Sequence, residues 1–177
     1  MVFGSCFGSI REKLSLLFLN ILSPPCLCLY MRIKIPIPVE GKPEEILKRF
    51  DRQLFEALSP PGIKVELLRF DGSKKGDKIH VRLHMPLLGK QDWVSVITEE
   101  VWSEQEAYFV DEGEQLPAFL SQWRHKHLVE AYKNGSRIVE DISYESPYKI
   151  LTILLYPVMY LQFAYRKIVY WKVFGRP

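Results

Sequence analysis

The sequence predicts an α+β fold in which a curved antiparallel sheet of about six to seven strands wraps around one long C-terminal helix, with a short helix near the N-terminal end of the domain. The elements follow the order strand, helix, several strands and final helix. Apolar and polar residues alternate strictly over residues 79–85, as in a strand with one face on a core and the other in water. Strands and helices do not alternate, so nothing indicates a parallel sheet. Such a sheet cannot close fully against one helix, and we expect a cavity lined by apolar side chains.

The first elements are a strand and a helix. Residues 32–39 alternate, and the two prolines among them suit an edge strand. Residues 42–59 have apolar side chains at helical spacing, with Pro43 at the helix start. Pro60-Pro61-Gly62 then ends the segment.

The middle of the chain is predicted to be strands joined by turns. Asp71-Gly72, Asp111-Glu112-Gly113 and Asn134-Gly135 are typical turn sequences. The predicted strands are residues 63–70, 79–85, 92–101, 106–111, 122–132 and 136–144.

A long apolar segment from Pro147 to Phe174 is predicted to be the final helix. Its period of about 3.6 residues places Leu151, Leu154, Val158, Leu161, Tyr165 and Val169 along one side. Pro157 should kink the helix or divide it.

Composition places the chain among globular proteins. The 177 residues suffice for one domain, and a hydrophobic content of 47% excludes general disorder. The formal net charge of +3 is too balanced to predict nucleic-acid binding, so no nucleic-acid partner is expected.

Charge is unevenly distributed along the chain. Between Lys90 and Arg124 there are eight acids and no base, whereas Pro147 to Pro177 carry five bases and no acid. Two solvated faces of opposite sign explain this pattern. The alternative is a basic C-terminal helix that makes transient contact with an anionic partner or membrane surface. Residues 150–165 are uncharged, but they are too few to span a bilayer.

Residues 1–30 differ from the rest and contain all three cysteines, Cys6, Cys26 and Cys28. Arg11 and Lys13 precede an apolar run, as in a secretory signal, but no small-residue cleavage site follows. We therefore predict a poorly ordered leader or an over-extended start at residues 1–30, a folded ligand-binding domain at residues 31–177, and a cytoplasmic location. Without cysteines, the domain has no disulfide framework and no thiolate-ligated metal site.

Short motifs recur in a defined order from Met31 to Phe174. They are Pro60-Pro61, Arg69-Phe70-Asp71-Gly72, Trp93 with Ser95 and Ile97, Phe109-Val110-Asp111-Glu112, Trp123-x-His125-x-His127, Glu140-Asp141-Ile142-x-Tyr144, Tyr156-Pro157, and Phe163 with Arg166-Lys167. In order and spacing the chain resembles the START-like, or SRPBCC, helix-grip superfamily, in particular its small bacterial ligand-binding branch. The resemblance implies a helix-grip fold with a deep hydrophobic pocket. Members bind or carry lipids, quinones and other apolar molecules, and some are cyclases or hydrolases.

Trp123, His125 and His127 are spaced by two, so on a strand they share one face, which should look into the grip. Three interpretations remain open for the histidines. They hydrogen-bond to sheet neighbours or to acids such as Glu140, they contact a ligand or act as general bases, or they bind a metal. The metal interpretation lacks a third ligand, so no metal and no cofactor are predicted. His80 and His84 share a face with Arg82 and suit a solvated sheet surface.

The predicted function is binding of a hydrophobic small molecule, such as a lipid, a quinone or a polyketide-like compound, between the sheet and the C-terminal helix. The expected ligand-binding residues are Val81, Leu83, Trp93, Trp123, His125, His127, Tyr144, Leu154, Val158, Leu161 and Tyr165. One alternative is a cyclase or hydrolase that uses His125 or His127 as general base. Another is an interaction module whose own side chains fill the cavity.

Overall fold

The computed structural model describes residues 30–177. The interpretations of residues 1–29, including the signal segment and the three cysteines, lie outside the described residues.

Within that range the chain forms seven strands and three helices. They are β1 (Met31–Val39), α2 (Pro43–Leu47), α3 (Arg52–Ala57), β2 (Lys64–Phe70), β3 (Lys78–Met85), β4 (Gly89–Trp102), β5 (Glu106–Gln115), β6 (Gln122–Tyr132), β7 (Gly135–Glu145) and α4 (Lys149–Phe174).

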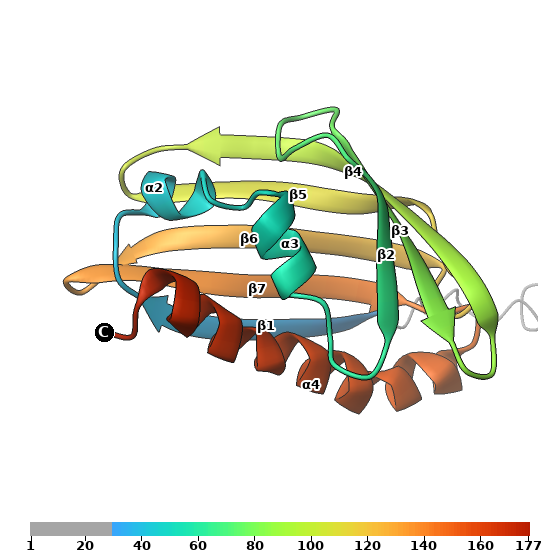
Figure 1. Ribbon diagram of the computed structural model, residues 1–177. Coiled ribbons are helices and arrows are strands. Elements are labelled where there is room, and N and C mark those ends of the chain that lie inside the picture. The colour runs from blue at the N-terminus through green and yellow to red at the C-terminus, as the bar shows by residue number, and fades with distance from the viewer. Residues whose placement is uncertain (1–29) are drawn as a thin grey trace, which may run out of the picture.

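All seven strands belong to one sheet in the order β1-β7-β6-β5-β4-β3-β2, and every neighbouring pair is antiparallel. The sheet curves strongly, so that β2 and β3 cross the direction of β5, β6 and β7, and α4 runs along β1 (Figure 1). β1 is an edge strand, the position in which a sheet tolerates prolines. The predicted α+β architecture is therefore confirmed.

The packed part of the core lies under β1 and β7, where α4 ends. Ile37 and Val39 of β1 and Tyr170 of α4 have no exposed surface, and Ile142 of β7 is equally buried. Phe50, between the two short helices, stacks near Phe174 and so joins them to this core. Apolar burial at this end supplies most of the contact between helix and sheet.

The single helix predicted for residues 42–59 is wrong, because the segment forms two short helices. Asp51 interrupts it: its backbone is extended, and its side chain accepts a hydrogen bond of 2.9 Å from the backbone N–H of Leu54. An aspartate in this position caps a new helix in preference to continuing the old one. The break also lets Phe50 turn into the core.

α4 departs from its prediction in two ways. Of the two effects predicted for Pro157, division of the helix is wrong, because α4 is continuous. Pro157 is exposed, so the carbonyl oxygen of Ile153, which has no N–H partner at Pro157, lies on the solvent side. The predicted apolar stripe is also wrong in phase, because Leu154 and Leu161 are 62% and 68% exposed. The buried positions are Thr152, Met159, Phe163, Tyr170 and Phe174.

Two predicted turns are also corrected. Asp111-Glu112-Gly113 lies inside β5, where a Cβ on Gly113 would come within 2.4 Å of the Leu116 side chain. The turn between β6 and β7 is made by Lys133 and Asn134, with Lys133 at a φ of 52°. Gly135 already belongs to β7, where a Cβ would lie 2.6 Å from the carbonyl oxygen of Val39. Both glycines thus permit close approach of the chain.

Among residues 30–177, no helix combines the length and the apolar character that a membrane crossing requires.

Candidate ligand cavity and its polar end

A cavity of about 270 Å³ lies between the sheet and the part of α4 from Leu151 to Arg166. Strands β2 to β6 and helix α3 contribute to its other walls. The apolar lining includes Phe55, Ile63, Val65, Ile79, Val81, Leu83, Met85, Leu88, Trp93, Phe119, Trp123, Leu151, Leu155, Val158, Met159 and Phe163. Its polar lining includes Ser95, Asp111, His125, His127, Gln162 and Arg166. The cavity is thus apolar apart from one group of hydrogen-bonding side chains.

Two tryptophans separate the apolar wall from the polar end. The rings of Trp93 and Trp123 meet edge to face with their centres 4.6 Å apart. Trp93 donates a hydrogen bond to the Ser95 hydroxyl at 3.1 Å, and Trp123 donates to Asp111 Oδ1 at 2.8 Å. Both indole N–H groups are therefore satisfied within the protein, and their ring surfaces face the cavity.

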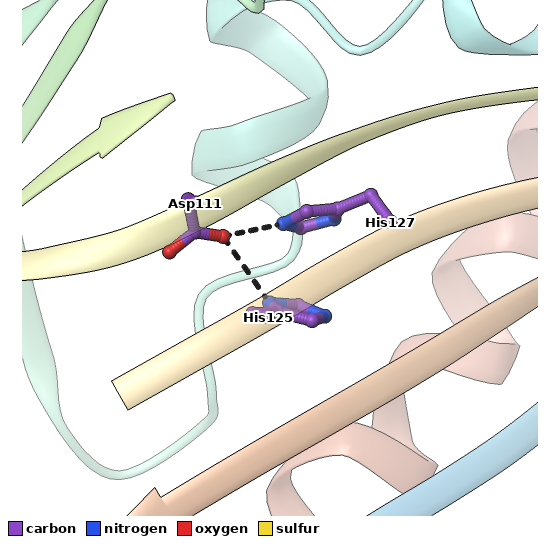
Figure 2. Close-up of side chains that lie close together, drawn as sticks. All are labelled: Asp111, His125 and His127. Atoms are coloured by element: carbon purple, nitrogen blue, oxygen red, sulfur yellow. Dashed lines mark hydrogen bonds and ion pairs between the residues drawn. The ribbon is translucent and has the colours of Figure 1, made fainter. Parts of the chain in front are cut away.

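The polar end is a buried cluster of one aspartate and two histidines. Asp111 on β5 lies opposite His125 on β6 in the strand register, and His127 is the next residue on the same face. Asp111 Oδ2 lies 2.9 Å from His127 Nε2 and 3.5 Å from His125 Nδ1. Figure 2 shows both imidazole rings directed at this one oxygen. All three residues are buried.

A second carboxylate, that of Glu140, is bonded to the other ring nitrogen of His125. Glu140 on β7 has no exposed surface, and its Oε2 lies 2.5 Å from His125 Nε2. The Tyr170 hydroxyl donates to Glu140 Oε1 at 2.6 Å, and Arg166 reaches the same oxygen at 3.3 Å. The predicted hydrogen bond between a histidine and Glu140 is confirmed. Glu140 thereby connects the cavity to the packed part of the core.

Burial and charge act in opposite directions on these groups. Burial acts to raise the pKa of Glu140, but Arg166 and His125 outweigh it and hold that pKa well below its ordinary value. Asp111 shows the same balance, with His127 and His125 lowering its pKa against burial. Burial, followed by the nearby His125, lowers the pKa of His127 to about 4. At neutral pH both carboxyls are therefore ionised and His127 is neutral.

The predicted ligand-binding residues divide into two groups. Val81, Leu83, Trp93, Trp123, His125, His127 and Val158 line the cavity. Tyr144, Leu154, Leu161 and Tyr165 do not. Leu154 and Leu161 face outward because of the phase of α4, and Tyr144 is buried beneath the start of α4, where its hydroxyl donates to the Thr152 carbonyl oxygen at 3.0 Å.

Four of the polar lining residues named above were missed from the sequence, namely Ser95, Asp111, Gln162 and Arg166. Asp111 was interpreted as a turn residue, although it alternates with the buried Ala107 and Phe109 and could have been assigned to the inner face. Gln162 and Arg166 lie on the side of α4 that the predicted stripe left out, and they face the cavity near Phe163. His80 and His84 lie outside the cluster, beside Asp92 and Glu66.

Comparison with known proteins gives matches in structure alone. No protein-family model matches the chain, and neither does any curated protein sequence. Protein CV1439 from Chromobacterium violaceum superposes with a TM-score of 0.55 and 13% identity, covering 83% of this chain and 99% of that one. The di-domain ARO/CYC StfQ from the steffimycin biosynthetic pathway gives a TM-score of 0.60 at 11% identity over 83% of this chain and 51% of its own. Ara h 8.0201 gives 0.54 at 12% identity, over 81% of this chain and 98% of its own.

The chain has the START-like helix-grip fold. In this helix-grip protein α4 packs closely against the sheet at the β1 edge, and the cavity lies toward the opposite edge, that of β2. The buried cluster of Asp111, His125 and His127 lies on the two central strands between these parts.

Proposed function

We propose that this helix-grip protein binds a small hydrophobic molecule with one polar group in the cavity between the sheet and α4. The observation that carries the proposal is an apolar cavity with hydrogen-bonding groups gathered at one end. Ligand sites commonly combine an apolar lining with a few convergent polar groups. The volume of about 270 Å³ lies just below the roughly 300–1,000 Å³ of drug-sized pockets, which favours a compact ligand.

The polar end offers a definite kind of contact. His127 Nε2 is engaged with Asp111, whereas His127 Nδ1 is buried without a hydrogen-bond partner in the protein. The Arg166 Nε is also unpaired and buried, and both residues line the cavity. A hydroxyl group on the ligand would donate to His127 Nδ1 and accept from the Arg166 Nε–H, and without it these atoms remain unpaired at a free-energy cost.

Native mass spectrometry of the full chain purified from its own source tests this proposal. We expect one apolar molecule per chain, which denaturation releases for identification. An empty protein that also fails to take up fatty acids, quinones and polyaromatic compounds would contradict it.

Catalysis on such a ligand is the second candidate, and the pairing of Asp111 with His127 favours it. An aspartate that accepts the Nε2–H leaves His127 Nδ1 with a lone pair, as a general base requires. Incubating the released ligand with fresh protein separates the two functions. A binder leaves it chemically unchanged, whereas an enzyme converts it, and His127→Gln then lowers turnover by more than it lowers binding.

We also infer that the outer face of α4 contacts a lipid surface, from which an apolar ligand would enter. Exposed large apolar side chains gather on this helix and its N-cap, namely Tyr148, Ile150, Ile153, Leu154, Val158, Tyr160, Leu161 and Ile168. Leu88, at the turn between β3 and β4, lines the cavity together with Leu151 and Leu155 of α4. α4 has no acid and carries the exposed bases Lys149, Lys167 and Lys172, which suit anionic headgroups.

Sedimentation with vesicles of phosphatidylcholine and phosphatidylglycerol tests this contact. We expect the protein to sediment with the vesicles and Leu154→Glu with Leu161→Glu to stay in solution. Trp102→Glu is the matched control, because Trp102 is an exposed aromatic residue on β4, away from α4. Equal sedimentation of all three proteins would contradict the inference.

A further inference from the structure

The hydrogen bonds around His125 leave two acceptor atoms facing each other. Glu140 accepts hydrogen bonds from the Tyr170 hydroxyl and from Arg166, and its Oε2 lies 2.5 Å from His125 Nε2, which places the imidazole hydrogen on Nε2. In a neutral imidazole, Nδ1 then has a lone pair, and it lies 3.5 Å from the ionised Asp111 Oδ2. Asp111 Oδ1 already accepts from Trp123, which orients Oδ2 toward the histidines. A positive charge between these atoms would turn the repulsive arrangement into an attractive one.

The charges of the buried residues also favour a bound cation in the cluster. Asp111 and Glu140 contribute two negative charges, and Arg166 contributes one positive charge, so one negative charge is left over among buried groups. Buried charges are ordinarily paired or bound to a metal. Either a proton on His125 or a bound metal ion would balance this charge.

The atoms are spaced as metal ligands would be. One ligand atom from each of Asp111, His125 and His127 lies within 4.8 Å of the other two. Glu140 behind His125 forms the carboxylate–histidine pair that commonly supports a metal-bound imidazole. Two imidazoles and one carboxylate are the ligand set of many zinc and non-haem iron sites that keep an open position. Here all three residues line the cavity, so the open position faces it.

We propose that Asp111, His125 and His127 bind a divalent transition-metal ion of the zinc class at the polar end of the cavity, with Glu140 as the positioning residue behind His125. The ion takes the place of the proton between His127 Nε2 and Asp111. The His127 Nδ1–H is then free to donate to a ligand in the cavity. Metal binding stands on these four side chains alone and does not depend on the identity of any apolar ligand.

Metal titration of the full chain tests this site. The three cysteines are changed to serine in every protein, because thiolates outside the described residues also bind zinc. After treatment with a chelator, we expect about one equivalent of Co²⁺ per chain, with the visible absorption of a four-coordinate nitrogen and oxygen site, and its displacement by Zn²⁺. Glu140→Gln should lower the affinity by about 10–100-fold, and His127→Gln and Asp111→Asn by more.

His80→Gln with His84→Gln is the matched control, because it removes two imidazoles outside the cluster and should leave binding unchanged. Near-ultraviolet circular dichroism shows whether each variant keeps its tertiary packing. If the cluster variants unfold, the stoichiometry and Co²⁺ spectrum of the parent protein decide alone. Binding far below one equivalent, or equal binding by folded His127→Gln, would overturn the proposal and leave a proton as the balancing charge.

Discussion

The two ends of the sheet differ in how the space against α4 is filled. Under β1 and β7, side chains such as Ile37 and Tyr170 are fully buried against one another. At the β2–β4 end, Leu83 and Trp93 are only partly buried and surround the cavity. Apolar burial stabilises the first end, whereas the second gives up part of that contact to leave room for a ligand. We expect substitutions to affect stability at one end and ligand binding at the other.

The largest difference should come from truncating one aliphatic side chain at each end. Ile37→Ala removes fully buried atoms and should lower the free energy of unfolding by about 3 kcal/mol. Leu83→Ala enlarges an existing cavity and should lower it by about 1 kcal/mol. Urea unfolding followed by tryptophan fluorescence measures both values. Equal losses would show that the cavity wall is as important for stability as the packed core.

Replacing one valine by phenylalanine at each end compares how well the two ends accept a larger side chain. Val39→Phe overfills the packed end and should lower the free energy of unfolding by about 1–3 kcal/mol. Val81→Phe points into the cavity and should cost less than about 1 kcal/mol. The same variant should prevent uptake of a fluorescent apolar probe. Probe binding that survives in folded Val81→Phe would place the binding site elsewhere.

Tyr144 connects β7 to the start of α4, where the hollow end begins. Its hydroxyl is the donor to the Thr152 carbonyl oxygen, and burial raises the pKa of this phenol to about 12. Tyr144→Phe removes that bond and should lower the free energy of unfolding by about 1 kcal/mol. Hydrogen exchange should show faster opening of the first turns of α4 and no change near Tyr170. A change spread evenly along α4 would mean that its two halves open together.

The smallest effect concerns an ion pair on the outer face at the β1 edge. The Arg32 guanidinium hydrogen-bonds Asp141 at 2.7 Å and lowers the pKa of that carboxyl. The pair therefore stabilises the fold above the unfolded-state pKa of about 4, and this contribution is lost as the pH falls through the lower folded value. Because Arg32 is exposed, Asp141→Asn should cost under about 1 kcal/mol at neutral pH. The difference from the parent should shrink between about pH 5 and pH 3, as thermal unfolding would show.

Local sequence patterns predicted the kinds of element and the inner face of several strands. Strict alternation placed Val81, Leu83, His125 and His127 on the inner face, since successive side chains of a strand point to opposite sides. The prolines of β1 indicated an edge strand, because proline cannot donate to a ladder. These properties depend on local geometry, which the chain specifies residue by residue. The break at Asp51 is also a local property, because an aspartate is a typical N-cap residue for the helix that follows it.

The side of α4 that faces the sheet, and the groups that meet at the polar end, depend on tertiary packing. α4 is apolar on several sides, so its period fits both the exposed Leu154 and the buried Phe163. Packing against β1 selected the side of Phe163 and left Leu154 in solvent. Asp111 reaches the two histidines through the pairing of β5 with β6, between residues 14 or more positions apart in the chain. Long-range strand register and helix rotation are set by the sum of many contacts, and no short stretch of sequence encodes that sum.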